Sequence, residues 1–313
     1  MIGERRRFGR TGFAVTPLAL GTSSWGAPRD GESDLDRDRR VGEVGDAFFA
    51  GRLATNLVDT SNIYGPAPEG PLAELLLGAA AARAGSGAAS GLVLQTKLDR
   101  DLATDDFGAD RMWRSLEESL TRLGVERVDV LYLHDPEVVG FESVMTPGGA
   151  VEALVEMKRQ GVTASIGISG GPVDMLQRFV ETDLFDALIT HNRFTLLDRS
   201  ADELLDAAAA RDVGVANAAP YGGGVLTGRP EFAGSYGYRP ITEAQSAELR
   251  RLAAVAERFG VPISALALGF SLREPRIHTT VVGASSLSSW NRATTDALAA
   301  ATAPAALWDE LLP

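Results

Sequence analysis

Short apolar runs alternate with amphipathic stretches along nearly the whole chain. Helix-like stretches occupy residues 109–123, 149–160, 173–181 and 200–211, and apolar residues within 113–120 recur at the three- and four-residue spacing of a helix. Between such stretches lie runs with the length and composition of buried strands, at residues 18–21, 56–59, 92–97, 129–134, 163–168, 187–191, 214–218 and 279–282.

This order of eight β-then-α units predicts an α/β fold, a (β/α)8 TIM barrel that spans residues 1–313 as one domain. A doubly wound open sheet is the alternative. Such sheets usually have a Gly-rich turn after the first strand, and no G-x-G-x-x-G motif follows residues 18–21. The barrel is therefore the favoured fold.

Three segments lie outside this repeat. Residues 5–16 predict an N-terminal β-hairpin that closes one end of the barrel. Residues 221–241, rich in Gly, Tyr and Pro, predict a long loop over a binding site at the C-terminal face, with a disordered surface loop as the alternative. The Ala-, Gly- and Ser-rich residues 79–91 predict a local loop.

Composition and charge exclude several classes of function. The net charge of −12 argues against a nucleic-acid partner, because phosphate contacts need a basic surface. The chain has no cysteine, which excludes disulfides, thiolate metal ligands and a cysteine nucleophile. No apolar stretch approaches the roughly 20 residues that span a bilayer, and the charged N-terminus does not resemble a signal peptide. We therefore expect a cytoplasmic protein without a membrane partner.

Four polar residues lie at the ends of three consecutive strand-like runs. Asp59, Lys97 and His134 each end a run, and Tyr64 follows Asp59 by five residues. In a barrel, the carboxyl ends of the strands form one face, where catalytic residues collect. Any one of these residues alone is more often structural. Together, an acid, an amine, an imidazole and a phenol predict a site that handles protons.

The chemistry of this cluster follows from the pKa values of its groups. A phenol near pKa 10 is a weak acid at neutral pH. An adjacent ammonium stabilises the phenolate, and a carboxylate behind the ammonium keeps it charged. We therefore expect Lys97 and Asp59 to make Tyr64 a better proton donor, and a neutral His134 to donate a hydrogen bond that orients a carbonyl. Proton transfer of this kind needs an accompanying transfer of an electron pair to or from the substrate, for example as a hydride.

These residues resemble the active site of the aldo-keto reductases. The resemblance implies a nicotinamide-dependent barrel enzyme that transfers a hydride between the cofactor and a carbonyl or sugar hydroxyl. In that enzyme Tyr64 is the general acid/base, Asp59 and Lys97 tune it, and His134 orients the substrate oxygen. The similar motifs are DTSNIYG at 59–65, TK at 96–97, LH at 133–134, and residues 18–22, 167–169, 219–228 and 282–286.

The resemblance also implies which residues bind the cofactor and substrate. Gly21 and Thr22 would line the nicotinamide end, and Ser169 would contact the carboxamide. Trp25, which soon follows the first strand, is expected to form a wall of the substrate pocket. The full set of implied cofactor residues is Gly21, Thr22, Ser169, His191, Pro220, Gly222, Gly283, Ser285, Ser286 and Arg292.

Three positions depart from the usual pattern of that family. His191 stands where a Gln usually binds the carboxamide, and Gly170 stands where an Asn usually makes a second contact. Ala218 takes the place of the aromatic residue that stacks on the nicotinamide. The candidates to replace that aromatic surface are Tyr221, Phe194 and Trp25.

The expected cofactor is NAD or NADP, with NAD slightly favoured. Members that select NADPH usually place Lys or Arg near residues 283–293 to pair with the 2′-phosphate, and Arg292 is the only basic residue there. Ser285, Ser286 and the helix after them are alternative phosphate ligands through hydroxyls and amides.

Residues 190–197 and 303–308 resemble a sugar-oxidising branch of the family that includes D-threo-aldose (L-fucose), L-galactose and pyridoxal dehydrogenases. The expected partner is therefore a small carbonyl compound or sugar. Two other functions stay open on the sequence. One is a nucleotide-binding barrel with little catalysis, and the other is a lyase in which Lys97 forms a Schiff base.

Overall fold

The computed structural model describes residues 3–65 and 72–312, and within them eight parallel strands close into a barrel. The strands are hydrogen-bonded in the order β12-β3-β4-β5-β6-β7-β8-β9. The predicted barrel is confirmed, and the open sheet is wrong. The strands span Leu18–Gly21 (β3), Leu57–Asp59 (β4), Val93–Leu98 (β5), Val128–His134 (β6), Thr163–Gly170 (β7), Ala187–His191 (β8), Gly214–Ala218 (β9) and Thr279–Gly283 (β12).

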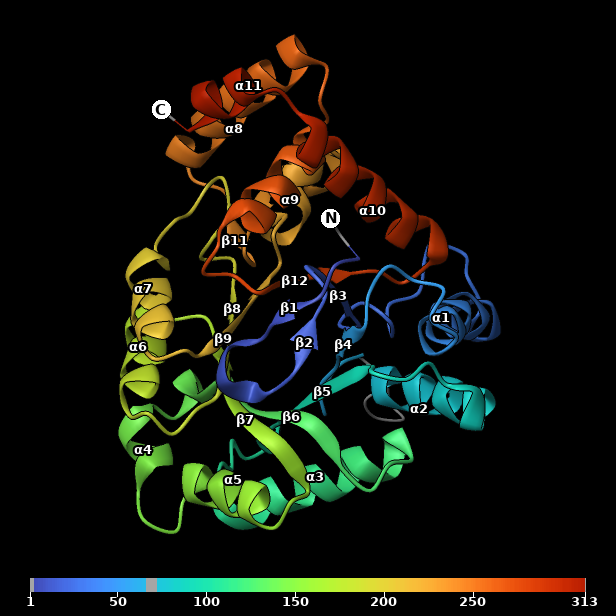
Figure 1. Ribbon diagram of the computed structural model, residues 1–313, viewed down its shortest axis with the longest axis vertical. Coiled ribbons are helices and arrows are strands. Elements are labelled where there is room, and N and C mark those ends of the chain that lie inside the picture. The colour runs from blue at the N-terminus through green and yellow to red at the C-terminus, as the bar shows by residue number, and fades with distance from the viewer. Residues whose placement is uncertain (1–2, 66–71, 313) are drawn as a thin grey trace.

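Helices surround this barrel (Figure 1). The stretches predicted at 109–123 and 173–181 match α3 and α6 residue for residue. No single described helix is long and apolar enough to cross a membrane, and among the described residues only the bent pair Glu243–Phe259 (α8) and Ile263–Arg273 (α9) passes that test by length and composition. The helices are α1 Asp34–Phe49, α2 Leu72–Ala84, α3 Ala109–Leu123, α4 Phe141–Met145, α5 Ala150–Arg159, α6 Val173–Glu181, α7 Asp202–Ala210, α8 Glu243–Phe259, α9 Ile263–Arg273, α10 Leu287–Thr302 and α11 Ala305–Leu311.

The expected loop at residues 79–91 is wrong in its first half. Helix α2 continues to Ala84, because its alanines are strong helix formers. It stops before Gly85, whose φ of 51° leaves the right-handed helical region.

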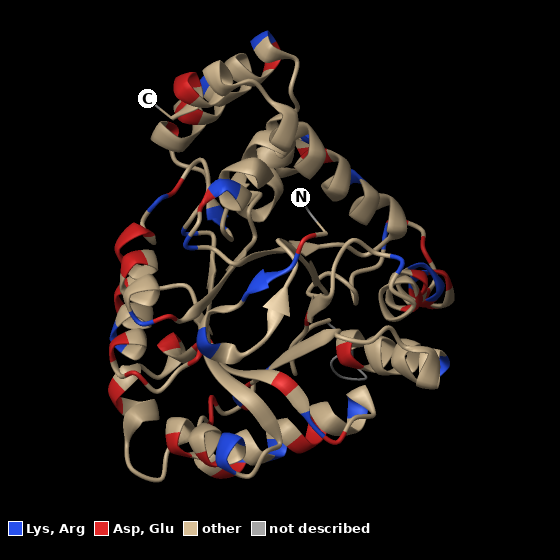
Figure 2. Ribbon diagram, in the orientation of Figure 1, with Lys and Arg blue, Asp and Glu red and all other residues tan. Residues whose placement is uncertain are grey.

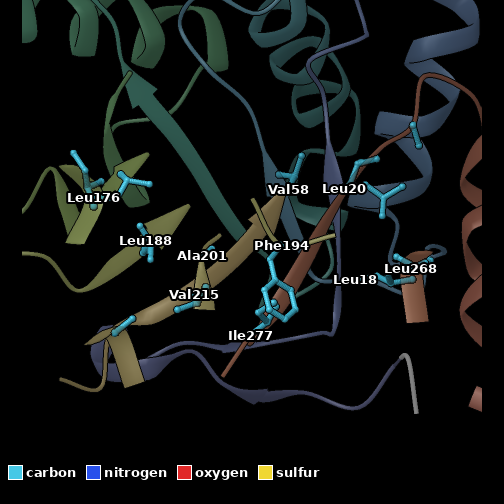
Figure 3. Packing of buried hydrophobic residues seen from close by; sticks show 14 of the residues in the cluster. Leu18, Leu20, Val58, Leu176, Leu188, Phe194, Ala201, Val215, Leu268 and Ile277 are labelled. Atoms are coloured by element: carbon cyan, nitrogen blue, oxygen red, sulfur yellow. The ribbon is translucent and has the colours of Figure 1, made fainter. Parts of the chain in front are cut away.

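The barrel strands separate two apolar layers. Leu18, Leu20 and Val58 belong to the outer layer, which packs against the helices, and Figure 3 shows part of it. Leu57 and Tyr132 belong to an inner cluster that fills the barrel. Charged residues lie mostly on the surrounding helices and loops, and the strands have few of them (Figure 2).

A hairpin of β1 (Arg6–Arg7) and β2 (Ala14–Val15) lies across the N-terminal end of the barrel, as predicted (Figure 1). Phe8, between these strands, is fully buried in the inner cluster. The Ser165 hydroxyl donates a hydrogen bond of 3.1 Å to the Thr11 carbonyl. This end is therefore closed, and the C-terminal face is left for a site.

The insertion at residues 221–241 folds over the C-terminal face. It contains the strands β10 (Ser235–Tyr236) and β11 (Arg239–Pro240), which pair as a short hairpin. The buried Tyr236 anchors it, because its hydroxyl donates a hydrogen bond of 2.8 Å to the Asn192 carbonyl. These contacts favour the prediction that residues 221–241 form a loop over a binding site, and they argue against a disordered surface loop.

Gly167 gives a testable link between the barrel interior and the site. A Cβ there would lie 2.3 Å from the Tyr132 ring, and the Tyr132 hydroxyl donates to Gln95 beneath Asp59. We predict that Gly167→Ala lowers the free energy of unfolding by about 1–3 kcal/mol through overpacking. Urea denaturation measures this loss.

The double variant Gly167→Ala/Tyr132→Leu separates the ring contact from other effects of the new methyl group. Removing the ring should relieve the clash, so the two changes together should cost less than the sum of the single changes. Strict additivity would contradict the proposed clash. Gly42→Ala is the control, because its Cβ would meet only the flexible end of Arg83, 3.3 Å away.

Candidate active site

Three neighbouring strands place the predicted polar residues at the C-terminal end of the barrel. Asp59 ends β4 and His134 ends β6, while Lys97 is the residue before the end of β5. Side chains alternate along a strand, so these three point inward like the barrel-filling residues of their own strands, such as Leu57. The structure therefore brings together residues that lie up to 75 positions apart, as the sequence predicted.

A buried ion pair between Lys97 and Asp59 forms the base of the site. Lys97 Nζ donates to Asp59 Oδ1 at 2.8 Å and to the Thr60 carbonyl at 2.7 Å, and the two side chains are 1% and 5% exposed. Gln95 Nε2 donates to the same Asp59 oxygen at 2.9 Å. Burial lowers the pKa of Lys97, but Asp59 and Tyr64 raise it further, so its pKa lies above the ordinary value. Lys97 therefore remains charged at neutral pH.

Tyr64 lies directly over this pair. Lys97 Nζ is 4.4 Å from the centroid of the Tyr64 ring, and the His134 ring lies edge-on to it at 5.9 Å between centroids. Burial raises the pKa of the phenol most; Lys97 lowers it and Asp59 raises it, and the net pKa is above the ordinary value. Lys97 lowers the pKa of the phenol, as expected, but Asp59 raises it, and burial makes the net shift upward in the protein alone.

His134 has a partner that the sequence analysis missed. Asp99 Oδ1 lies 2.6 Å from His134 Nδ1, and the Ser61 hydroxyl donates to Asp99 Oδ2 at 2.6 Å. Burial lowers the pKa of His134, but Asp99 raises it more, with a further rise from Asp135. The pKa of His134 therefore lies above its ordinary value, and its ring is paired with a carboxylate that the expected hydrogen-bond donor did not include. The signal was present two residues after Lys97, in the sequence TKLD.

These groups open onto a cavity of about 560 Å³ at the C-terminal face. Asp59, Tyr64 and His134 form part of its wall. The insertion covers it with Tyr221, Gly223, Gly224, Thr227, Phe232 and Tyr238. Of the predicted cofactor residues, the ones that line it are Gly21, Ser169, His191, Pro220 and Gly283. Gly222 is buried beside them in the glycine turn.

Two predicted wall residues lie in the core instead. Trp25 is fully buried and its indole N–H donates to the Ala284 carbonyl at 2.9 Å, so the prediction that it forms a wall of the substrate pocket is wrong. Thr22 is also fully buried, and its hydroxyl donates a hydrogen bond of 3.0 Å to the Asp59 carbonyl. Thr22 therefore supports the end of β4 and does not line the cavity.

The residues predicted for the adenosine end lie at the start of α10. Ser286 is the N-cap of that helix, and its hydroxyl accepts a hydrogen bond from the Ser289 amide at 3.2 Å. Arg29, which sequence analysis missed, donates to the same hydroxyl at 3.2 Å. Ser285 accepts from Arg40 through its carbonyl, and Arg292 is exposed on the helix.

Comparison with known proteins agrees with this geometry. The profile of the Aldo/keto reductase family matches residues 17–301. L-galactose dehydrogenase of Arabidopsis thaliana is 31% identical over 290 residues, which cover 91% of this chain and 85% of that protein. D-threo-aldose 1-dehydrogenase of a Pseudomonas species is 33% identical over 208 residues, 66% of this chain and 62% of that protein. The solved structure of aldo-keto reductase AKR11C1 from Bacillus halodurans (holo form) has a TM-score of 0.76 at 21% identity and covers 98% of this chain and 95% of its own.

The chain belongs to the aldo/keto reductase family. Aldo-keto reductases are oxidoreductases that act on aldehydes or sugars and use nicotinamide cofactors. The resemblance noted in the sequence is thereby confirmed at the level of the family.

The positions that depart from the usual aldo-keto reductase pattern have structural consequences. The space of the missing Asn side chain at Gly170 is filled by Glu137, since a Cβ there would lie 2.8 Å from Glu137 Oε2. Burial has the largest effect on the pKa of His191 and lowers it, while Asp135 raises it and His134 lowers it. The net pKa is below the ordinary value, so His191 stays neutral at neutral pH. Beside Ala218, the aromatic candidate Tyr221 lines the cavity.

Phe194, another candidate for the missing aromatic surface, is unavailable to a ligand. It is 3% exposed and stacks on Phe270, with 4.7 Å between ring centroids and an interplanar angle of 16°. With Trp25 also in the core, Tyr221 is the one of the three predicted aromatic residues that reaches the cavity.

The cavity wall fits the nicotinamide cofactor that the family uses. A Cβ at Gly283 would meet only Ser24 Oγ, at 3.9 Å, so its bare backbone forms an open wall. Gly223 and Gly224 have φ of 77° and 108°, and successive glycines of this kind expose backbone amides that favour a phosphate. Asp135 Oδ1 is buried without a hydrogen-bond partner among the described residues, and it supplies an acceptor in the wall.

The buried Lys97–Asp59 pair predicts that removing one of its two charges destabilises the fold. Lys97→Met leaves Asp59 buried without its cation, and we predict a loss of about 3–5 kcal/mol in the free energy of unfolding. The double variant Lys97→Met/Asp59→Asn should recover part of that loss, because no unpaired charge remains. Chemical denaturation measures both.

Arg83→Met is the matched control for this experiment. Its ion pair with Asp46 lies on the surface, with side chains 51% and 40% exposed. Such pairs contribute about 0–1 kcal/mol. An equal loss in Arg83→Met and Lys97→Met would contradict the assignment of a structural role to burial of the Lys97–Asp59 pair.

Proposed function

We propose that the protein is a nicotinamide-dependent dehydrogenase that moves a hydride between the cofactor and a carbonyl or sugar hydroxyl, with Tyr64 as general acid/base. The convergence of Asp59, Tyr64 and His134 on the wall of the cavity of about 560 Å³, with Lys97 buried against Asp59 and the Tyr64 ring, supports this most. The similarity to L-galactose and D-threo-aldose dehydrogenases supports a sugar as substrate.

The nicotinamide supplies the hydride chemistry when it is bound. In sugar oxidation, Tyr64 would act in its deprotonated form: the C–H bond of the reacting carbon and the O–H bond of its hydroxyl break, the hydride would pass with both electrons of the C–H bond to the bound nicotinamide, and the proton would go to the Tyr64 phenolate oxygen. In reduction, Tyr64 returns its proton to the carbonyl oxygen as the C–H bond forms. The deprotonated form of Tyr64 needs a nearby cation, and Lys97 fits this role, because its Nζ lies 4.4 Å from the ring centroid and its charge and hydrogen bond lower the pKa of the phenol.

The remaining residues of the site have supporting roles in this proposal. Asp59 keeps Lys97 in place and charged. Ser169 and His191 would hold the carboxamide, Gly21 and Gly283 would face the nicotinamide ring, and the Pro220 to Gly224 turn would hold the pyrophosphate. Each of these roles comes from the family and from the positions of these residues around the cavity.

The structure favours neither alternative function. A Schiff base needs a neutral amine, but Lys97 is 1% exposed and charged in its pair with Asp59. A barrel that only binds a nucleotide does not require a tyrosine, a histidine and a carboxylate paired with a buried ammonium to meet at one cavity. The complete set of four residues therefore supports catalysis.

Tyr64→Phe tests the proposed acid/base. We predict that the variant binds NAD as tightly as the wild type and loses about 10²–10⁴-fold in turnover, because general acid–base catalysis contributes that much. Turnover is followed by cofactor absorbance, with L-fucose, L-galactose, D-arabinose and pyridoxal as the substrate panel. A variant with undiminished turnover would refute the role of Tyr64.

The residues at the start of α10, where the adenosine end of the cofactor would bind, predict which dinucleotide the protein prefers. We expect NAD to bind more tightly than NADP, because Ser286 already caps α10 and Arg292 is the only basic residue of the segment. Arg29→Ala should weaken NADP binding further and leave NAD binding unchanged, since its guanidinium is 3.2 Å from Ser286 Oγ. Calorimetric titration of both dinucleotides checks this, and tighter binding of NADP to the wild type would contradict it.

A further inference from the structure

Asp99 and His134 form a buried carboxylate–imidazole pair beside the reacting position. Asp99 is 1% exposed, and its Oδ1 lies 2.6 Å from His134 Nδ1. The backbone holds Asp99 on both sides, because its amide donates to Ser115 Oγ at 3.0 Å and its carbonyl accepts from Arg111 Nε at 3.0 Å. The Ser61 hydroxyl donates to its other carboxylate oxygen at 2.6 Å. The carboxylate therefore has one orientation toward His134.

This pairing determines which ring nitrogen of His134 has a hydrogen. An ionised carboxylate only accepts hydrogen bonds, so the hydrogen of a neutral imidazole must be on Nδ1. Nε2, on the opposite side of the ring, then has a lone pair and can only accept. Nε2 becomes a donor only when the ring takes up a second proton and is an imidazolium.

We propose that Asp99 is a positioning residue that fixes His134 as the Nδ1–H tautomer, so that the charge of His134 decides what the pocket binds at Nε2. The neutral ring accepts a hydrogen bond from a substrate hydroxyl. The imidazolium donates one to a carbonyl oxygen. This role of Nε2 rests on the proposed function, whereas the tautomer and its dependence on Asp99 do not.

The other charges around His134 act on its Nε2 side or at greater range. Asp135 Oδ1 lies 3.7 Å from His134 Nε2 and 3.9 Å from His191 Nε2. Burial lowers the pKa of His134, Asp99 and Asp135 raise it, and Lys97 lowers it; the phenol of Tyr64 is neutral at neutral pH. Because the net shift is upward, the imidazolium persists to a higher pH than in a free histidine.

The chain is well suited to a direct test, because it has only three histidines. Nitrogen-15 NMR of histidine-labelled protein without ligands reports the protonation of each ring nitrogen across a pH titration, and His134→Asn assigns the signals. His278 is an internal reference of the opposite tautomer, since its Nδ1 accepts from the Val215 amide at 3.0 Å. Above its titration midpoint, His134 should show a protonated Nδ1 and an unprotonated Nε2, the reverse of His278.

Asp99→Asn is the decisive variant. With Ser61 donating to the amide oxygen, the Asn amide nitrogen donates to His134 Nδ1, so the neutral ring should switch to the Nε2–H tautomer. The titration midpoint should move to lower pH, because burial remains and the Asp99 charge is gone. Asp135→Asn is the matched control: it also removes a nearby carboxylate, and it should lower the midpoint without changing the tautomer. The signals of His278 should stay in place in both variants.

Two outcomes would overturn the proposal. A wild-type His134 with the hydrogen on Nε2 in its neutral form would refute the assigned tautomer. An Asp99→Asn protein with both tautomer and midpoint unchanged would refute the role of Asp99. Since neither measurement needs a cofactor, a wild type without any nicotinamide-dependent turnover would refute the proposed function and leave the tautomer result standing.

The catalytic consequence has its own measurement. The pH dependence of kcat/KM for sugar oxidation should rise with the deprotonation of His134 seen by NMR, and in Asp99→Asn this limb should disappear or move to lower pH. Chemical shifts that respond to Asp99→Asn while the rate limb stays in place would overturn the hydrogen-bonding role given to Nε2.

Discussion

The site depends on a positive charge buried at the C-terminal end of the barrel. Lys97 is almost fully removed from water, and a buried ammonium of this kind is tolerated only with a partner carboxylate and further hydrogen bonds. Asp59 supplies the carboxylate, and the Thr60 carbonyl accepts another of its hydrogens. Gln95 and Tyr132 continue the network into the barrel interior. The Tyr64 ring packs against this ammonium, with Lys97 Nζ 4.4 Å from the ring centroid.

The sequence was sufficient for the fold and for the gathering of the four polar residues. Strand-like runs and helical periodicity are local patterns, and the barrel follows from their alternation. Asp59, Lys97 and His134 could be placed together because the carboxyl ends of parallel strands meet on one face. Their inward direction is consistent with strand alternation, since each lies an even number of positions from a barrel-filling residue of its own strand, namely Leu57, Val93 and Val130.

What the sequence could not predict depends on loops and on burial. Trp25 follows the first strand closely, yet the loop turns its indole into the core and onto the Ala284 carbonyl. The direction of the Tyr64 pKa shift also required the structure, because it is a balance between burial and two opposing charges. Asp99 was visible two residues after Lys97, but only the packing of β5 against β6 shows that it meets the ring of His134.

In the proposed reaction, a hydride leaves a carbon held beside Tyr64 and His134 and passes to a nicotinamide. The most direct measurement uses an aldose deuterated at its anomeric carbon, with mass spectrometry of the cofactor after turnover. We predict that the reduced nicotinamide contains the deuterium and that turnover shows a primary isotope effect. Turnover that leaves the deuterium out of the cofactor would contradict direct hydride transfer at this site.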